Sequence, residues 1–287
     1  MTAVLKHELR GYAHSVSSYL FCAFLLLFVG VGALLYNIES AVANFEYVLE
    51  FVCIGLTVII PVLTMRVIAE ERRARTDQLL YSLPLTTAQI VGGKYLALLV
   101  VYLVPLCVIA LYPLIFAQYG DVYLLTAYGS LFAFFIMGAA MIAVGMFISS
   151  LTDSQGFAAG IAIVVFLFNY YSVSLAENIS TTAFGAALAF GVLAFLLGLG
   201  VYRLTKNGLI GYGVAIAVMA ATLIAMFVDD GGLTTLLPTL MEKLSLFARF
   251  TAFVNGVFDL TSIVFYLSVA VFFLFLTAQS LEKRRYS

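Results

Sequence analysis

Residues that can do chemistry are few in this chain, and none occurs in the spacing of a known catalytic motif. The two histidines, His7 and His14, lie near the amino terminus, and neither H-E-x-x-H nor G-x-S-x-G occurs. The segment nearest to a phosphate-binding loop, Gly-Gly-Lys-Tyr at residues 92–95, lacks the earlier glycine and has a tyrosine where magnesium needs a serine or threonine hydroxyl. We therefore expect that the chain is not an enzyme by itself and does not hydrolyse nucleotide.

The cysteines give no indication of a metal site. Cys22, Cys53 and Cys107 lie inside apolar runs, without C-x-x-C or Cys/His spacing. Thiols in such surroundings are typically inert apolar side chains. We expect neither a metal site nor a disulfide framework.

A few polar side chains inside apolar runs are candidates for lining a path across a membrane. Glu50 is the candidate for ion coupling, because an acid inside a span is costly and usually functional, although it lies only about one turn from the end of its run. Asn169 and Tyr170 could line a polar cavity, but interhelical hydrogen bonding or anchoring at the membrane surface explains them equally well.

The composition excludes a water-soluble domain. Of the 287 residues, 64% are hydrophobic and 10% are charged, whereas globular domains have roughly 45–50% apolar and about 25% charged residues. The 14 Lys and Arg residues are balanced by 15 Asp and Glu residues, so the concentrated basic surface of a nucleic-acid-binding protein is missing. The chain is predicted to be an all-α polytopic membrane protein in contact with lipid.

Apolar runs long enough to cross a bilayer as helices occur eight times. They lie at residues 20–35, 47–64, 95–116, 123–148, 157–173, 184–202, 210–228 and 260–277. With the amino terminus in the cytoplasm, twelve of the 14 basic residues fall inside and only Lys243 and Arg249 fall outside. This bias predicts a multi-pass protein of the plasma (inner) membrane with both termini in the cytoplasm.

Two segments outside the spans have helical, amphipathic spacing. Residues 1–15 place Leu5, Leu9 and Tyr12 on one face, which predicts an elbow helix lying at the cytoplasmic interface. Residues 229–259 are expected to form an amphipathic segment at the outer interface, as a simple lid or as a substrate gate. The first apolar run could also be a cleaved secretory signal, but residues 16–36 are long for one.

The cytoplasmic loop at residues 66–94 contains the most informative pattern. Opposite charges at i,i+4 spacing, such as Arg66 with Glu70, predict that the helix of the second span runs on past the membrane. Pro84 ends a short segment with two leucines, and Thr86 with Gln89 has the spacing of a capping box that begins the next helix. The loop could be an ordinary charged turn, or it could be a docking element that transmits force from a cytoplasmic partner.

The sequence of this loop closely resembles permease subunits of ABC-2-type transporters, and most closely the gliding-motility and nitrous-oxide-reductase-maturation permeases. The matching residues include Pro61, Thr64 to Arg66, Ala69 to Arg72, Arg75 with Thr76, Leu79 with Leu80, Leu83 to Thr86, Ile90 with Val91, and Gly93 to Ala97. The resemblance continues in residues 143–155, 250–260 and 281–285. Many relatives have six spans, so residues 184–228 are expected to be an additional transmembrane hairpin.

The resemblance implies a single permease domain over residues 1–287, with the ABC-2 (type V exporter-like) fold. Such a subunit pairs with a second permease copy or homologue and with two ABC ATPase subunits, which bind ATP and magnesium, so no cofactor is expected in this chain. It implies ATPase docking through Glu70, Glu71, Arg72, Asp77, Gln78, Leu79, Leu80, Tyr81, Ser82 and Pro84, with a smaller contact at Asp153, Ser154 and Gln155.

Three functions remain open from the sequence. The first is an ATP-driven exporter, with lipid or peptide weakly favoured as cargo. The second is a mechanical transducer that acts on an accessory envelope protein without moving cargo, and the third is an ion-coupled carrier that uses Glu50. The G-x-x-x-G pair formed by Gly156 and Gly160 is a candidate for the permease dimer seam, although packing within one subunit is the alternative.

Overall fold

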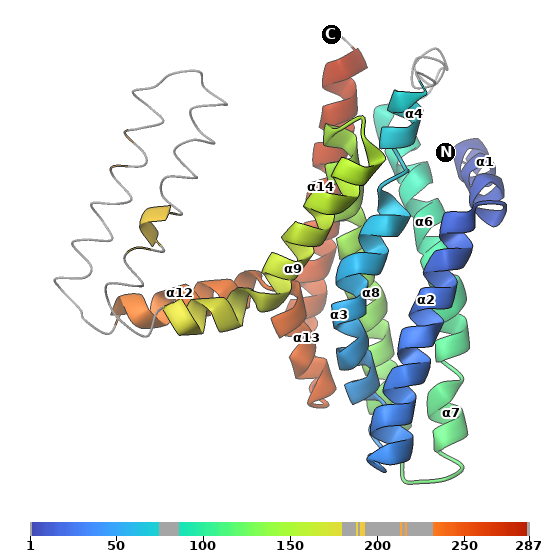
Figure 1. Cartoon of the computed structure of the whole chain (residues 1–287), viewed down its shortest axis with the longest axis vertical. Coiled ribbons are helices and arrows are strands. Elements are labelled where there is room, and N and C mark those ends of the chain that lie inside the picture. Colours follow the sequence, from blue (N-terminus) through green and yellow to red (C-terminus); the bar gives the residue numbers. More distant parts are fainter. Residues whose placement is uncertain are drawn as a thin grey trace. The chain divides into compact units, whose positions relative to one another are not determined.

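The computed structural model describes residues 2–74, 86–179, 188, 190–192, 213, 216 and 232–285, and within these residues every regular element is a helix (Figure 1). The helices are α1 (Thr2–Ala13), α2 (Val16–Gly32), the π-helix η1 (Ala33–Glu39), α3 (Glu46–Thr64), α4 (Ala69–Arg73), α6 (Thr87–Ile109), α7 (Tyr112–Phe116), α8 (Leu124–Leu151), α9 (Gln155–Ile179), α12 (Gly232–Leu244), α13 (Leu246–Val254) and α14 (Leu260–Arg285).

Six helical stretches in the described part of the chain are long and apolar enough to cross a membrane. They are Val16–Glu39, Glu46–Arg73, Thr87–Phe116, Leu124–Leu151, Gln155–Ile179 and Leu260–Lys283. They coincide with the first five predicted spans and the last one. The other two predicted spans, at residues 184–202 and 210–228, fall almost wholly outside the described residues, so the count of eight and the additional hairpin remain predictions.

The chain divides into two compact units. The first contains residues 1–168 and 249–287, and the second contains residues 169–248. Helices α1 to α4, α6 to α8 and α14 belong to the first unit, which therefore holds most of the predicted spans and the whole described part of the loop predicted to be cytoplasmic.

Helix α8 forms the core of the first unit, because it packs against α14, α3 and α6. Its glycines allow this close packing. A Cβ atom at Gly138 would collide with the Tyr102 ring of α6, and one at Gly145 would collide with the Thr64 side chain of α3. The Tyr102 hydroxyl donates a hydrogen bond to the Phe134 carbonyl (3.0 Å), so the polar end of this buried ring is satisfied.

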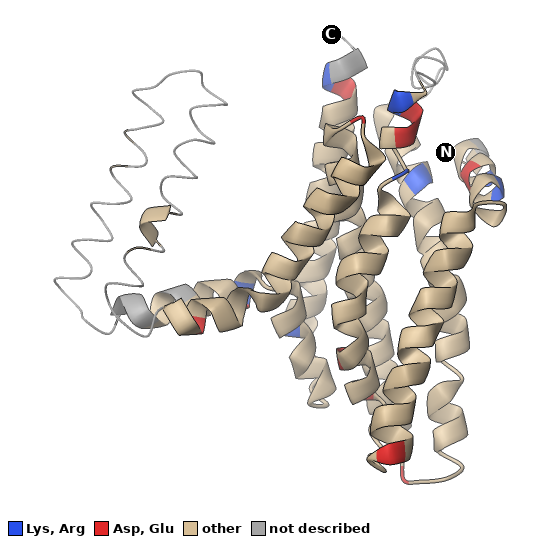
Figure 2. Ribbon diagram, in the orientation of Figure 1, with Lys and Arg blue, Asp and Glu red and all other residues tan. Residues whose placement is uncertain are grey.

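The charged side chains of the first unit are sorted along the helix axes (Figure 2). Helix α1, helix α4 and the last turns of α14 lie at one end of the unit (Figure 1), and they contain basic residues that include Arg10, Arg72 and Lys283. Glu46, in contrast, lies in the first turn of α3, at the opposite end of that helix from α4. This sorting agrees with the side predicted to be cytoplasmic, and that orientation stays a prediction.

The two segments predicted to be amphipathic both contain helices. Helix α1 covers most of residues 1–15 and packs against α6. Residues 229–259 contain α12 and α13, and the helical structure is interrupted between them at Ser245. Whether these helices lie at the two membrane surfaces stays a prediction.

Candidate functional site

The candidate site is the root of the loop predicted to be cytoplasmic, where α3 ends and α4 begins. The predicted helical extension of the second span is interrupted at residues 65–68, and α4 begins at Ala69. The buried Ser149 hydroxyl of α8 explains the break. It donates to the Met65 carbonyl (3.1 Å) and accepts from the backbone N–H groups of Ile68 (3.3 Å) and Ala69 (3.2 Å). One side chain of α8 thus satisfies backbone groups on both sides of the break.

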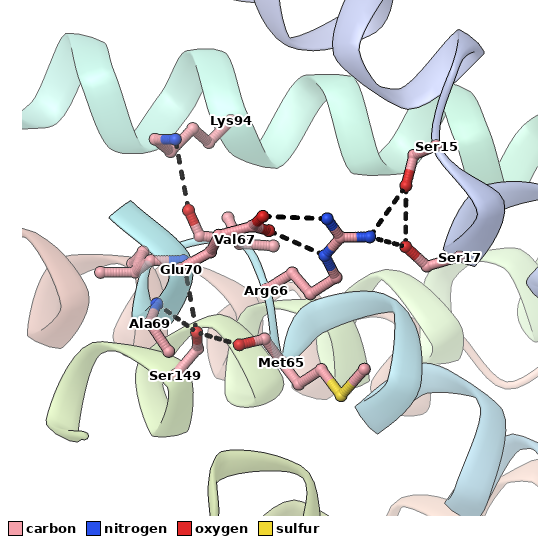
Figure 3. A network of polar contacts seen from close by, with 10 residues as sticks. Ser15, Ser17, Met65, Arg66, Val67, Ala69, Glu70, Lys94 and Ser149 are labelled. Carbon is pink, nitrogen blue, oxygen red and sulfur yellow. Dashed lines mark hydrogen bonds and ion pairs between the residues drawn. The ribbon is translucent and has the colours of Figure 1, made fainter. Parts of the chain in front are cut away.

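Lys94 ties this root to two other helices. Its side chain is only 2% exposed, although it is charged and lies near the start of α6. Its ammonium group donates to Glu8 of α1 (2.7 Å), to Glu71 of α4 (2.6 Å) and to the Val67 carbonyl (3.3 Å), the last of which Figure 3 shows. A buried ammonium is costly unless it is paired, and here the three acceptors come from α1, from the turn between α3 and α4, and from α4.

Arg66 forms a second link between the root and the α1–α2 corner (Figure 3). Its guanidinium group donates to both carboxylate oxygens of Glu70 (2.7 and 2.9 Å), which confirms the predicted i,i+4 pair. A third nitrogen donates to the hydroxyls of Ser15 (3.2 Å) and Ser17 (2.8 Å), which lie where α1 turns into α2. Both members of the ion pair are partly exposed, so their Coulomb energy contributes little to stability, and the bidentate geometry is the more important feature of the pair.

The far side of the loop begins with the predicted capping box. The Thr86 hydroxyl accepts from the Gln89 backbone N–H (3.3 Å), and the Gln89 side chain accepts from the Thr86 N–H (3.3 Å). Helix α6 therefore starts at Thr87, as the spacing of these two residues predicts.

Arg72 connects the root with the predicted second contact. Its side chain is 2% exposed, and one guanidinium nitrogen lies 3.9 Å from a carboxylate oxygen of Asp153 in the turn between α8 and α9. Asp153 and Ser154 are exposed, and Gln155 is partly exposed as the first residue of α9. The structure thus places Arg72 of α4 beside an accessible turn.

Several predicted site residues fall outside this cluster. The predicted docking residues Asp77, Gln78, Leu79, Leu80, Tyr81, Ser82 and Pro84 lie outside the described residues.

The membrane cavity candidates are divided between the two units. Glu50 lies half-buried in α3 of the first unit, and Asn169 with Tyr170 lies in the second. The Asn169 side chain accepts from the Leu246 N–H (2.9 Å) and donates to the Leu244 carbonyl (3.4 Å), across the break between α12 and α13. This use of the amide favours interhelical hydrogen bonding over a cavity role.

Tyr170 and the glycine pair each have surroundings that bear on their predicted roles. The Tyr170 ring packs edge-on against Phe247 of α13, with 5.1 Å between the ring centroids. Gly156 and Gly160 are exposed on α9, and a Cβ atom at either position would have no described atom within 4 Å. Packing within one subunit therefore receives no support from the described residues at these glycines.

An apolar cleft of about 440 Å³ lies at the end of α8 opposite to Ser149. Its lining comes from the first turns of α8 and from the connection between α13 and α14, and it includes Thr126, Phe132, Phe253, Val257 and Phe258. The Ser130 hydroxyl in this lining donates to the backbone carbonyls of Thr126 (2.9 Å) and Phe253 (3.0 Å), so the cleft keeps an almost wholly apolar surface.

In the part of the chain that the structure describes, all the regular elements are helices, and six stretches are long and apolar enough to cross a membrane. A family model described as ABC-2 family transporter protein matches residues 3–188, which is 186 of the 287 residues. The chain belongs to this family. It is therefore a permease of the ABC-2 type, the membrane subunit of an ABC transporter, which is not itself catalytic and functions with an ABC ATPase subunit. A comparison with curated proteins found no match.

Proposed function

We propose that the chain is the permease of an ATP-driven exporter and that its separate ATPase docks on the loop between α4 and α6. The observation that supports this proposal most directly is the bracing of both ends of the loop. The Lys94 ammonium, near the start of α6, donates to the carboxylate of Glu71 in α4, the helix at the other end of the loop. A push on the loop therefore acts on a joined root rather than on two independent chain ends.

The contacts of the root supply a path for this push into the membrane. Ser149 connects α4 to α8, and α8 packs against α3, α6 and α14. Lys94 and Arg66 connect the same root to α1 and to the start of α2. Motion of the root would thus be passed to most helices of the first unit as a body, because packed interiors transmit displacement rather than absorb it.

The apolar cleft at the other end of α8 supports an apolar or amphipathic cargo, such as a lipid or a peptide. Ligand sites are usually concave and mostly apolar, and this cleft has aromatic side chains from two segments of the chain, including Phe132 and Phe258. The cleft lies far along α8 from Ser149, so cargo bound in it would be released on the side of the membrane away from the ATPase.

The proposed assembly contains two copies of this permease, or one copy and a homologue, with two ATPase subunits that hold ATP and magnesium. The exposed Gly156 and Gly160 face of α9 is the proposed seam between permeases. An accessory envelope protein could complete the complex. If ATP hydrolysis moved such a partner without moving cargo, the complex would act as a mechanical transducer.

The test is affinity purification of the full chain from its native membrane, followed by mass identification of its partners and an ATPase assay. We expect a P-loop ATPase to copurify, and we expect Leu79→Arg or Leu80→Arg in the docking segment to abolish its recovery. The matched control is Leu111→Arg, because Leu111 is 54% exposed, lies between α6 and α7 at the end of α6 away from the docking loop, and is not part of the lining of the apolar cleft.

The outcomes separate the three functions. Recovery of the ATPase with the control but not with the loop variants supports docking, and cargo movement by the reconstituted complex then supports export. ATP hydrolysis without any cargo movement supports the mechanical transducer. Recovery of the chain alone, with transport that persists without ATP and is lost in Glu50→Gln, would support the ion-coupled carrier and contradict the proposal.

A further inference from the structure

An apolar groove of about 240 Å³ lies beside α1 in the first unit and has no role in the proposed function. It is lined by Leu9 and Tyr12 of α1, by Ser18 and Cys22 of α2, and by Val101 and Val104 of α6. The lining includes strongly exposed apolar side chains such as Val104, which is 57% exposed. Because the α2 and α6 walls belong to predicted membrane spans, this groove opens toward lipid rather than toward water.

A polar cleft of about 330 Å³ adjoins the groove, and Tyr12 lines both. The polar cleft is lined by α1, by the α1–α2 corner and by the loop root that contains Arg66, Glu70 and Lys94. Burial and the nearby carboxylates of Glu8 and Glu71 raise the pKa of Tyr12, so its phenol is a neutral hydrogen-bond donor. A polar compartment and an apolar one therefore meet at a single side chain near the end of the bundle.

Ser18 gives a second, independent indication of a ligand. Its side chain lines the apolar groove and is 7% exposed, yet its hydroxyl has no hydrogen-bond partner among the described residues. Buried hydroxyls are normally hydrogen-bonded, so an unpartnered one needs an explanation. The missing acceptor would lie between the polar cleft and the apolar end of the groove, which is where a glycerolipid carries its ester carbonyls.

The charges of the polar cleft select the head group. Glu8, Glu70 and Glu71 face it with Arg66 and Lys94, and each of the two cations already has a carboxylate partner. An anionic head group would find no cation in excess there. A head group with an ammonium would find carboxylate oxygens, which are its preferred acceptors.

We propose that this pair of compartments is a binding site for one phospholipid with an amine-bearing head group, held against α1, α2 and α6. The ammonium lies among the carboxylates of the polar cleft, an ester carbonyl accepts from Ser18, and one acyl chain lies along Cys22 and Val104. The bound lipid would fill the space beneath α1 and help to hold that helix against the loop root.

The test uses the full chain in nanodiscs of phosphatidylcholine that contain a trace of phosphatidylethanolamine with a photoreactive diazirine on one acyl chain. After irradiation and digestion, mass spectrometry locates the adducts. We expect adducts concentrated in the α2 and α6 segments around Cys22 and Val104. Excess unlabelled phosphatidylethanolamine should compete, and phosphatidylglycerol should compete poorly because its head group is anionic.

Val104 and Val108, which are four residues apart on α6, provide a matched pair of variants. Val104→Trp fills the groove and should abolish the concentrated adducts, whereas Val108→Trp lies outside the lining and should leave them unchanged. Both side chains are exposed, at 57% and 44%, so neither substitution disturbs the core. Ser18→Ala should weaken competition by unlabelled lipid about three- to tenfold, which is the value of one hydrogen bond.

Three results would overturn the proposal. Adducts spread over all lipid-facing helices in proportion to exposure would show that no site exists. Equal loss with Val104→Trp and Val108→Trp would show that the groove is not the place of binding. Equal competition by phosphatidylglycerol and phosphatidylethanolamine would contradict the selection of the head group by the carboxylates. None of these results depends on ATPase docking, so the lipid site and the exporter proposal can fail separately.

Discussion

The ammonium group of Lys94 on α6 lies 2.6 Å from the carboxylate of Glu71 on α4, so the two arms of the loop between α4 and α6 are joined at their root. The same ammonium group lies 2.7 Å from the carboxylate of Glu8 on α1. One buried cation thus holds together three elements that are far apart in the sequence.

The first prediction concerns the charge of Lys94. Lys94→Met keeps an unbranched side chain that is one atom shorter, but leaves the Glu8 and Glu71 carboxylates without their cation. Removing one partner of a fully buried ion pair costs about 3–5 kcal/mol, and we expect the lower end because both carboxylates are partly exposed. Thermal unfolding in detergent measures the loss, and the ATPase assay should show hydrolysis that is no longer stimulated by the permease.

Lys6→Met is the matched control for this substitution, because Lys6 is an exposed lysine on α1. It should change neither the unfolding temperature nor the ATPase stimulation. Equal effects of the two substitutions would mean that net charge at this end, and not the link made by Lys94, is responsible.

The second prediction compares two neighbouring serines at the end of α8. Ser149→Ala removes the hydroxyl that bonds Met65, Ile68 and Ala69, and leaving buried backbone groups unsatisfied should cost about 1–3 kcal/mol. The Ser150 hydroxyl is also buried but has no hydrogen-bond partner among the described residues, so Ser150→Ala should be neutral. The free energies of unfolding of the two variants test this prediction, and a similar loss of stability in each would contradict the role of Ser149 at the break.

Local spacing predicted a good part of the site. Thr86 with Gln89 and Arg66 with Glu70 are three and four residues apart, and both interactions are present. Such pairs follow from helix geometry alone. The apolar runs also predicted the six described spans, because length and hydropathy suffice for that.

The remaining features of the site depend on packing between distant segments. Lys94 and Glu8 are 86 residues apart, and Ser149 lies 80 residues from the amide that it accepts from at Ala69. In the sequence, Lys94 belongs to a segment that partly resembles a phosphate-binding loop and to the residues that match ABC-2 permeases, and neither pattern indicates an ion pair. The available signal was a lone lysine beside a long apolar run, because such a lysine requires an anionic partner. That the partner is Glu8 follows only from the packing of α1 against α6.

The third prediction tests the close crossing of α3 and α8. Gly145→Ala would place a methyl group against the Thr64 side chain, whose hydroxyl already donates to the Ile60 carbonyl (3.0 Å). Overpacking of this kind costs about 1–3 kcal/mol. The control is Gly30→Ala on α2, where the added methyl meets no described atom within 4 Å. Unfolding temperatures should separate the two, and unchanged stability in Gly145→Ala would mean that the helices can move apart at little cost.

The fourth prediction concerns pH and the start of α14. The Asp259 carboxylate accepts from the N–H groups of Thr261 (3.0 Å) and Ser262 (3.1 Å) and from the Ser262 hydroxyl, and the last of these bonds is the main reason that the pKa of Asp259 is lowered. The stabilisation by the ionised cap is therefore complete above the ordinary Asp value of about 3.9 and is lost as the pH falls through the lower folded pKa.

Asp259→Ala should cost about 0.5–1 kcal/mol at neutral pH, the low end for a helix cap at an accessible position. Unfolding curves at neutral pH and in acid should show the difference between wild type and variant shrinking in acid. A difference that does not change with pH would show that the cap acts without its charge, and Asp259→Asn, which cannot titrate there, provides that reference.

The last prediction concerns the proposed seam. Gly160 is exposed on α9, and no described atom occupies the space where its side chain would be, so the face is open to a second permease. In a chain whose native cysteines, Cys22, Cys53 and Cys107, are replaced by serine or alanine, Gly160→Cys should form disulfide-linked dimers in oxidised membranes. Gly30→Cys, on the similarly open face of α2, should not. Because small residues let two helices approach closely, crosslinking at Gly160 alone places α9 at the seam, whereas active membranes without any Gly160 dimer would exclude it.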